Sequence, residues 1–403
     1  MKNMLKITTG HKGFNLLMKK LSLVNIESVL EILASLSFLM IVLMKISLPV
    51  KDVLSLLEVV FGCIILLYHF SRYGISLGLL CILFLLLIAC GLNYFFVGAI
   101  TTVLFMKLFF VHLPIALVLV QNKRLHAKIW QFCFFFLSVF LMYRLYIAPD
   151  GIRIFADTSR NMISAFLITA ACIYKVSLRC KQNKPDYAIV LTILFCSIAA
   201  KGRGGIVSAI VLLLLTLFVR YYLNNGKRKT RKWVLEVVIV SVALLALSFV
   251  IYINSSWLIS EYLPRFSDSQ FYSAGYSNEI RLFFLHTYFH GIMEIKSLLL
   301  GFNMIGTSWL ATIAQGNIHN SYLQVHSYMG IIGLTIFLMS ITVGLKHIIR
   351  KKDYYFAAFI ITFLLRILTD YILPGNIGDI ISWYFILLVV SKKKYIKVRC
   401  DED

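Results

Sequence analysis

Long apolar segments alternate with short polar ones along most of the chain. Apolar residues make up 60% of its 403 positions, and many runs approach the ~20 residues that a helix needs to cross a bilayer. None alternates apolar and polar positions as the strands of a membrane barrel do. The pattern therefore predicts an all-α polytopic membrane protein with about twelve spans. These are 29–44, 53–68, 74–91, 98–120, 129–147, 162–178, 187–200, 205–223, 233–253, 324–345, 354–373 and 380–391.

One long polar stretch, 254–323, interrupts the series of spans. It separates an N-terminal membrane region of about nine helices, 1–253, from a C-terminal region of about three helices with a basic tail, 324–403. Its centre, from Ser277 to about Leu300, has the pattern of one amphipathic helix, which Gly301 should end. Long ordered loops in compact proteins are usually functional.

The basic residues predict the orientation in the membrane. With the N-terminus inside, the inner segments hold 28 of the 40 Lys and Arg and the outer segments hold 10. Cytoplasmic loops typically carry such an excess. We therefore predict that both termini are cytoplasmic and that the long loop lies outside. The net charge of +22 then reflects topology and contact with anionic lipids, and it does not indicate nucleic-acid binding.

Neither metal nor cofactor is expected. The eight cysteines lie in spans or on the inner side and form no CxxC pair, which leaves the long loop without a disulfide framework. His286, His290 and Glu294 recur at intervals of four on one helix face, but the HExxH pattern is absent. We interpret them as a solvated or headgroup-facing stripe.

The segment Lys201–Gly205 comes directly before an apolar helix that is predicted to run from outside to inside. The start of that helix presents unpaired N–H groups and the positive end of the helix dipole. Gly204 and Gly205 let a bulky anion approach the backbone, and Arg203 can bind phosphate oxygens in a bidentate way. The same residues equally suit a charged helix end anchored among lipid headgroups. On these residues alone both interpretations stay open.

A second helix start is predicted to face outward just before the tenth span. Asn320 or Ser321 is the natural N-cap. His319 precedes the cap, where the helix dipole disfavours the protonated imidazole. A neutral imidazole on the outer face could act as a general base. A hydrogen-bonded histidine at the membrane interface is the alternative, and it is the commoner role of a lone histidine.

Two cations fall inside expected spans. Lys107 and Arg366 are costly in lipid unless they are paired or face a cavity. Asp370 lies one helical turn after Arg366, which predicts an ion pair within the helix.

Three segments together resemble the O-antigen polymerase and ligase superfamily of bacterial envelope glycosyltransferases. They are AKGRGG at 200–205, NEIRLFF at 278–284 and HNSYLQVHSYMGIIGL at 319–334. The similarity covers about 187–345, and its strongest part is the His-Asn pair followed by Gly-x-x-Gly. Gly202 stands where the family more often has serine before the arginine. Members of this family join glycans carried on undecaprenyl diphosphate at the outer face of the inner membrane, without a metal or nucleotide.

The resemblance implies a fold of the GT-C type in a multi-pass protein of the bacterial inner membrane, with its site on the periplasmic face. His319 would be the base for the acceptor hydroxyl, and Arg203 and Arg281 would stabilise the departing diphosphate. The further candidates for substrate binding are Lys201, Gly204, Gly205, Asn320 and Arg265.

The expected substrate is an oligosaccharide linked to undecaprenyl diphosphate, and the expected partners are membrane lipids, a chain-length regulator and a flippase. We favour a polymerase of O-antigen or capsule, because the sequences HNSYLQ and GIIG and the 403-residue length are typical of polymerases. A ligase that transfers finished polymer to lipid A–core is the nearest alternative. A flippase for lipid-linked sugar is more remote, since the sequence has no clear internal repeat.

Overall fold

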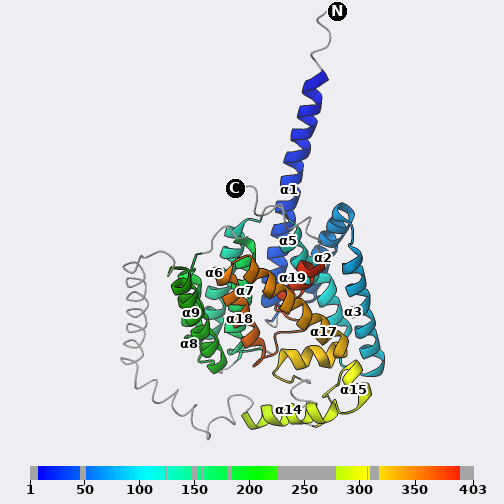
Figure 1. Cartoon of the computed structure of the whole chain (residues 1–403), viewed down its shortest axis with the longest axis vertical. Coiled ribbons are helices and arrows are strands. Elements are labelled where there is room, and N and C mark those ends of the chain that lie inside the picture. The colour runs from blue at the N-terminus through cyan, green and yellow to red at the C-terminus, as the bar shows by residue number, and fades with distance from the viewer. Residues whose placement is uncertain are drawn as a thin grey trace, which may run out of the picture.

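The computed structural model describes residues 8–45, 51–122, 125–147, 153–155, 158–178, 184–224, 278–305, 307–308 and 317–390. The predicted all-α architecture is confirmed for these residues, apart from a hairpin of two short strands, β1 (Arg153–Phe155) and β2 (Thr158–Ser159). The expected ninth span, 233–253, lies outside the described residues. Figure 1 shows a bundle of helices from which α1 extends at one end, while α14 lies across the other end.

Most helices keep close to the expected spans, but α1 begins well before the expected first span, 29–44. The helices are α1 (Thr8–Leu43), α2 (Lys51–Tyr73), α3 (Leu77–Phe96), α4 (Thr102–Lys107), the π-helix η1 (Leu108–His112), α5 (Leu113–Gln121), α6 (Ala127–Tyr146), α7 (Met162–Leu178), α8 (Tyr187–Ala199), α9 (Arg203–Asn224), α14 (Asn278–Gly291), α15 (Ile295–Leu300), α17 (Ser321–Arg350), α18 (Tyr354–Ile367) and α19 (Asp379–Val390).

Seven helical segments among the described residues are long and apolar enough to cross a membrane. The shorter helices α7, α8, α18 and α19 are also apolar. The chain is therefore a helical, multi-pass membrane protein. The total of twelve spans stays a prediction. The seven segments are Ile26–Leu43, Lys51–Tyr73, Leu77–Phe96, Thr102–Gln121, Ala127–Tyr146, Gly204–Leu223 and Ser321–Arg350.

The core of the bundle lies around α7. Every residue from Ile163 to Ser177 is buried, because α6, α8, α9 and α18 pack around this helix. By contrast α2, α3 and α9 leave large apolar side chains exposed, among them Leu67, Phe84 and Leu214. In water the exposure of such side chains is unfavourable, whereas in lipid it costs little because the acyl chains are equally apolar. These three helices therefore form part of the lipid-facing surface.

Some boundaries differ from the expected ones. The single loop helix expected from Ser277 to about Leu300 is instead two helices, α14 and α15, which are separated after Gly291. The chain turns there so tightly that a Cβ at Gly291 would lie 2.3 Å from the Phe302 ring. The eleventh span, expected to reach 373, ends as a helix at Ile367. Beyond it, backbone groups of Asp370, Ile372 and Leu373 bind the Ser321 side chain instead of continuing the helix.

Candidate functional site

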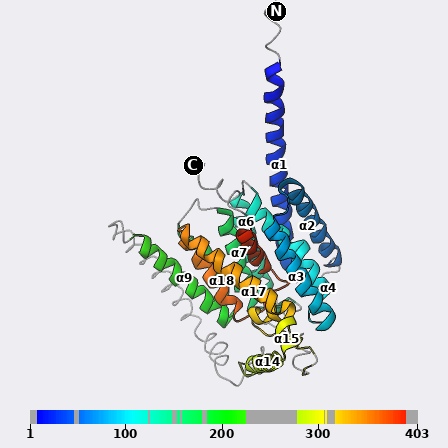
Figure 2. The same ribbon diagram turned by 45° about the vertical axis from the view of Figure 1, so that its right-hand side comes forward.

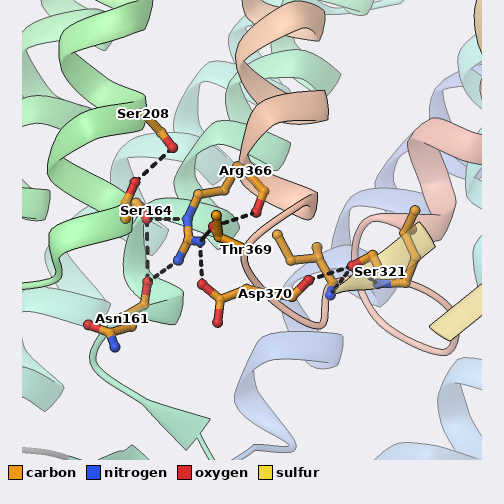
Figure 3. Close-up of polar contacts among 10 residues, drawn as sticks. Asn161, Ser164, Ser208, Ser321, Arg366, Thr369 and Asp370 are labelled. Atoms are coloured by element: carbon orange, nitrogen blue, oxygen red, sulfur yellow. Dashed lines mark hydrogen bonds and ion pairs between the residues drawn. The ribbon is translucent and has the colours of Figure 1, made fainter. Parts of the chain in front are cut away.

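Arg366 lies at the C-terminal end of α18, at the predicted outer end of the bundle, and its side chain is fully buried. Its Nε donates to Ser164 Oγ at 2.9 Å, and Nη2 donates to the Asn161 carbonyl at 2.7 Å. Nη1 donates to Thr369 Oγ1 at 2.7 Å and forms an ion pair with Asp370. We call these five residues the Arg366 network (Figure 3). The predicted pair with Asp370 is confirmed, although Asp370 lies beyond the end of the helix.

The glycines of the segment 201–205 pack directly on this network. A Cβ at Gly204 would lie 3.4 Å from both Arg366 Nη1 and Thr369 Oγ1. A Cβ at Gly205 would lie 2.6 Å from Ser164 Oγ. Close packing of α9 against α7 therefore requires a small residue at Gly205. The predicted approach of an anion to this backbone stays a prediction.

The two cations of the same segment flank the start of α9. Arg203 is the first residue of α9, so the helix begins slightly earlier than predicted and includes Gly204 and Gly205. Lys201 follows the end of α8 with a φ of 55°, a left-handed conformation that is common just after a helix. Burial lowers the pKa of the Lys201 amino group.

The segment around His319 contacts α14. The His319 ring stacks on Phe284, with the ring centroids 6.4 Å apart and an angle of 15° between the planes. Phe284 also belongs to a small buried cluster with Tyr288, Met304 and Ile318. Asn320 caps α17, since its side chain accepts a hydrogen bond from the Leu323 N–H at 3.1 Å, as predicted.

This contact relates two of the three sequence motifs. Arg281 lies on α14 one helical turn before Phe284, and residues three apart share a helix face. The motif that contains Arg281 and the motif that begins at His319 are therefore neighbours in space. The sequence did not predict this contact, because Phe284 looked like any other apolar residue of an amphipathic helix.

The chain after Arg366 connects the motif that contains Arg203 to the motif that begins at His319. Ser321 Oγ donates to the Asp370 carbonyl at 2.6 Å and accepts from the Ile372 N–H at 2.8 Å. Ser321 directly follows Asn320, and Asp370 pairs with the guanidinium against which Gly204 packs. One short segment, 366–372, thus packs against the start of α9 and is hydrogen-bonded to the start of α17 (Figure 3).

The remaining candidates lie elsewhere. His286 and His290 are exposed on α14, in agreement with a solvated or headgroup-facing stripe, and Glu294 is exposed beyond its end. Arg265 lies outside the described residues. Asn161 and Ser164 belong to no motif and could not have been selected from the sequence. Arg366 gave one signal in advance, the high cost of an arginine within an apolar span.

No protein-family model matches the sequence, and no curated protein matches it either. The resemblance to the polymerase and ligase superfamily therefore rests on the three segments themselves.

Proposed function

We propose that this protein is a polymerase of a cell-surface polysaccharide. It would transfer a glycan from undecaprenyl diphosphate to a sugar hydroxyl of a second lipid-linked repeat, at the outer face of the bacterial inner membrane. The enzyme would be a metal-independent glycosyltransferase with about twelve spans and a fold of the GT-C type.

The observation that carries the proposal is that the three motifs gather at one end of the bundle. The start of α9 with Arg203 and the start of α17 are joined by Arg366, Asp370 and Ser321. The helix that contains Arg281 stacks Phe284 on His319. In the sequence these motifs are more than a hundred residues apart from first to last. Their convergence on one helix-end surface favours a shared site over three separate membrane anchors.

The proposed reaction is a single displacement. The acceptor hydroxyl oxygen attacks the anomeric carbon of the donor sugar, and its proton passes to His319. The bond between that carbon and the diphosphate oxygen breaks, and undecaprenyl diphosphate leaves with the electron pair. Arg203, Arg281 and the N–H groups at the start of α9 would stabilise the charge that develops on the diphosphate. A single displacement inverts the anomeric carbon.

The conformation of His319 adds support. Among the described residues, the non-glycine positions with positive φ are Lys201, His319 and Lys352. Lys201 and Lys352 each follow a helix end, where the left-handed conformation is common. His319, with a φ of 56°, instead precedes a helix N-cap, where no such rule applies. Strained backbone of this kind concentrates at functional sites.

Purified protein in liposomes tests the proposal. The substrate would be the lipid-linked repeats extracted from cells that lack the gene, because those repeats carry the correct sugar. We expect a ladder of polymers and release of one undecaprenyl diphosphate for each new linkage. Folded protein that forms no ladder would contradict the proposal. A product that forms only after addition of lipid A–core would favour the ligase instead.

The orientation is tested separately with reporter fusions. Fusions after Lys232, Lys352 and Lys394 should report the cytoplasm, and a fusion at Ser273 should report the outer side, because basic loops stay inside. A cytoplasmic signal at Ser273 would reverse the topology and put the site on the wrong face for this reaction.

A further inference from the structure

The short helix α15 enters the bundle between two apolar helices. The Leu300 carbonyl accepts a hydrogen bond from Asn93 Nδ2 at 2.7 Å, and Asn93 lies one turn before the end of α3. On the other side, a Cβ at Gly330 would lie 2.0 Å from the Leu299 carbonyl oxygen. Gly330 is the kink of α17 and lies more than two turns inside that helix. α15 therefore packs beside the last turn of α3 and the kink of α17, at the end of the bundle where α14 lies (Figures 1 and 2).

The last carbonyls of a helix have no partner within it, and side chains of α3 and α17 bind those near the end of α15. Besides the bond from Asn93, His326 Nε2 contacts the Leu298 carbonyl at 2.8 Å. A carbonyl only accepts, so this nitrogen is the donor. Ser327 Oγ donates to the Phe302 carbonyl at 2.7 Å. At a solvent-exposed surface, water would donate hydrogen bonds to these carbonyls, whereas in lipid the protein itself must provide the donors.

The outward side of the same segment exposes large apolar side chains, flanked by the exposed Glu294 and Lys296. Met293 is 82% exposed, Ile295 75% and Leu299 50%. α15 also contacts α3, and Phe95 near the end of α3 is 80% exposed. Exposed apolar patches on a rigid element mark contact with a partner or a membrane. This patch continues the exposed apolar surface of α3, a helix long and apolar enough to span the membrane.

We propose that α15 lies in the outer leaflet of the membrane, with its exposed apolar side chains among the acyl chains. Two independent observations support this occupant. The carbonyls near the end of α15 accept hydrogen bonds from protein side chains, as the interior of a bilayer requires. The exposed apolar side chains of α15 lie beside α3, which has a lipid-facing side. The proposal does not depend on glycosyl transfer and holds for any activity of the protein.

Photocrosslinking from single positions tests the contact. Benzoylphenylalanine would replace Ile295, with Phe95 as the lipid-facing control and Lys184, an exposed residue at the predicted inner end, as the polar control. The full-length variants would be irradiated in vesicles of phosphatidylethanolamine and phosphatidylglycerol and analysed by mass spectrometry. We expect lipid adducts at Ile295 in a yield similar to that at Phe95 and several-fold above that at Lys184.

Other products at Ile295 would overturn the proposal. A crosslinked dimer would mean that a second copy covers the patch, and a crosslink within the chain would mean that another segment does. A lipid yield no higher than at Lys184 would mean that the patch faces water. Because an apolar aromatic replaces an exposed apolar residue, the variant should fold, and its melting temperature would be compared with that of the parent protein.

A second variant tests the anchoring of α15. Asn93→Leu removes the donor to the Leu300 and Ser327 carbonyls while α3 stays apolar. The lipid yield at Ile295 should fall several-fold and the yield at Phe95 should not change. Unchanged yields at both positions would show that Asn93 does not hold α15 in the membrane, contrary to the proposal.

Discussion

The two ends of the bundle both bury charged side chains but use them differently. At the predicted inner end, Glu31 accepts hydrogen bonds from the His126 N–H at 2.8 Å and from Trp130 Nε1 at 2.9 Å, and it pairs with the His126 ring. Lys175 pairs with Asp186 at 3.2 Å. These contacts attach α1 to α6 and α7 to the start of α8. They hold helices together and involve none of the three motifs.

At the predicted outer end, the buried charge lies among the motif segments instead. Arg366 binds the backbone carbonyl of Asn161 before α7, and Asp370 leads to Ser321 at the start of α17. A buried charge that is fully hydrogen-bonded is weak evidence for stability, yet it fixes geometry. We therefore propose that the inner contacts serve assembly of the bundle and that the outer contacts position residues of the proposed site.

The largest expected difference between the ends concerns Arg203 and Arg281. Arg203→Ala or Arg281→Ala should abolish polymer while the protein stays in the membrane at its normal level, because the diphosphate loses its charge partner. Arg→Lys should restore only part of the activity, since an ammonium cannot reproduce the planar fork of a guanidinium. Polymer in cell extracts measures both effects.

Arg220 is the matched control, because it lies on the same helix as Arg203 but near the predicted inner end. Arg220→Ala should make polymer in the normal amount. Normal polymer from Arg203→Ala or Arg281→Ala would show that this arginine is not part of the site. An equal loss of polymer in Arg203→Ala and Arg220→Ala would contradict the proposed difference between the two ends.

A smaller effect should follow from changes in the two buried networks. Arg366→Lys keeps the charge but cannot bind Ser164, Asn161 and Thr369 together. We expect kcat per folded molecule to fall by roughly 10- to 100-fold, the usual consequence of displaced reacting groups. Glu31→Gln at the inner end should lower the melting temperature and leave kcat per folded molecule unchanged. If Arg366→Lys lowers only the amount of folded protein, Arg366 has no positioning role.

The sequence predicted the class of fold well, because the length and apolar content of a span depend only on the thickness of the bilayer. It also placed a helix start close to Arg203 and a cap at Asn320 or Ser321, of which Asn320 is the one that caps α17, since both follow from local rules. It missed what long-range contacts decide. The division of the loop helix at Gly291 depends on the Phe302 ring, and two partners of Arg366, Ser164 and Asn161, lie about two hundred residues away in the sequence.

The account as a whole depends most on His319 as the general base. The direct measurement is the initial rate of linkage formation by purified His319→Ala protein in liposomes, beside His286→Ala as a control on the same outer surface. We expect His319→Ala to lose about 10²–10⁴ in rate, the usual contribution of a catalytic base, and His286→Ala to stay close to the parent rate. In the parent protein the rate should rise with pH as the imidazole loses its proton, whereas a phosphate contact through His319 would make it fall. A His319→Ala protein that extends chains at the parent rate would contradict the account.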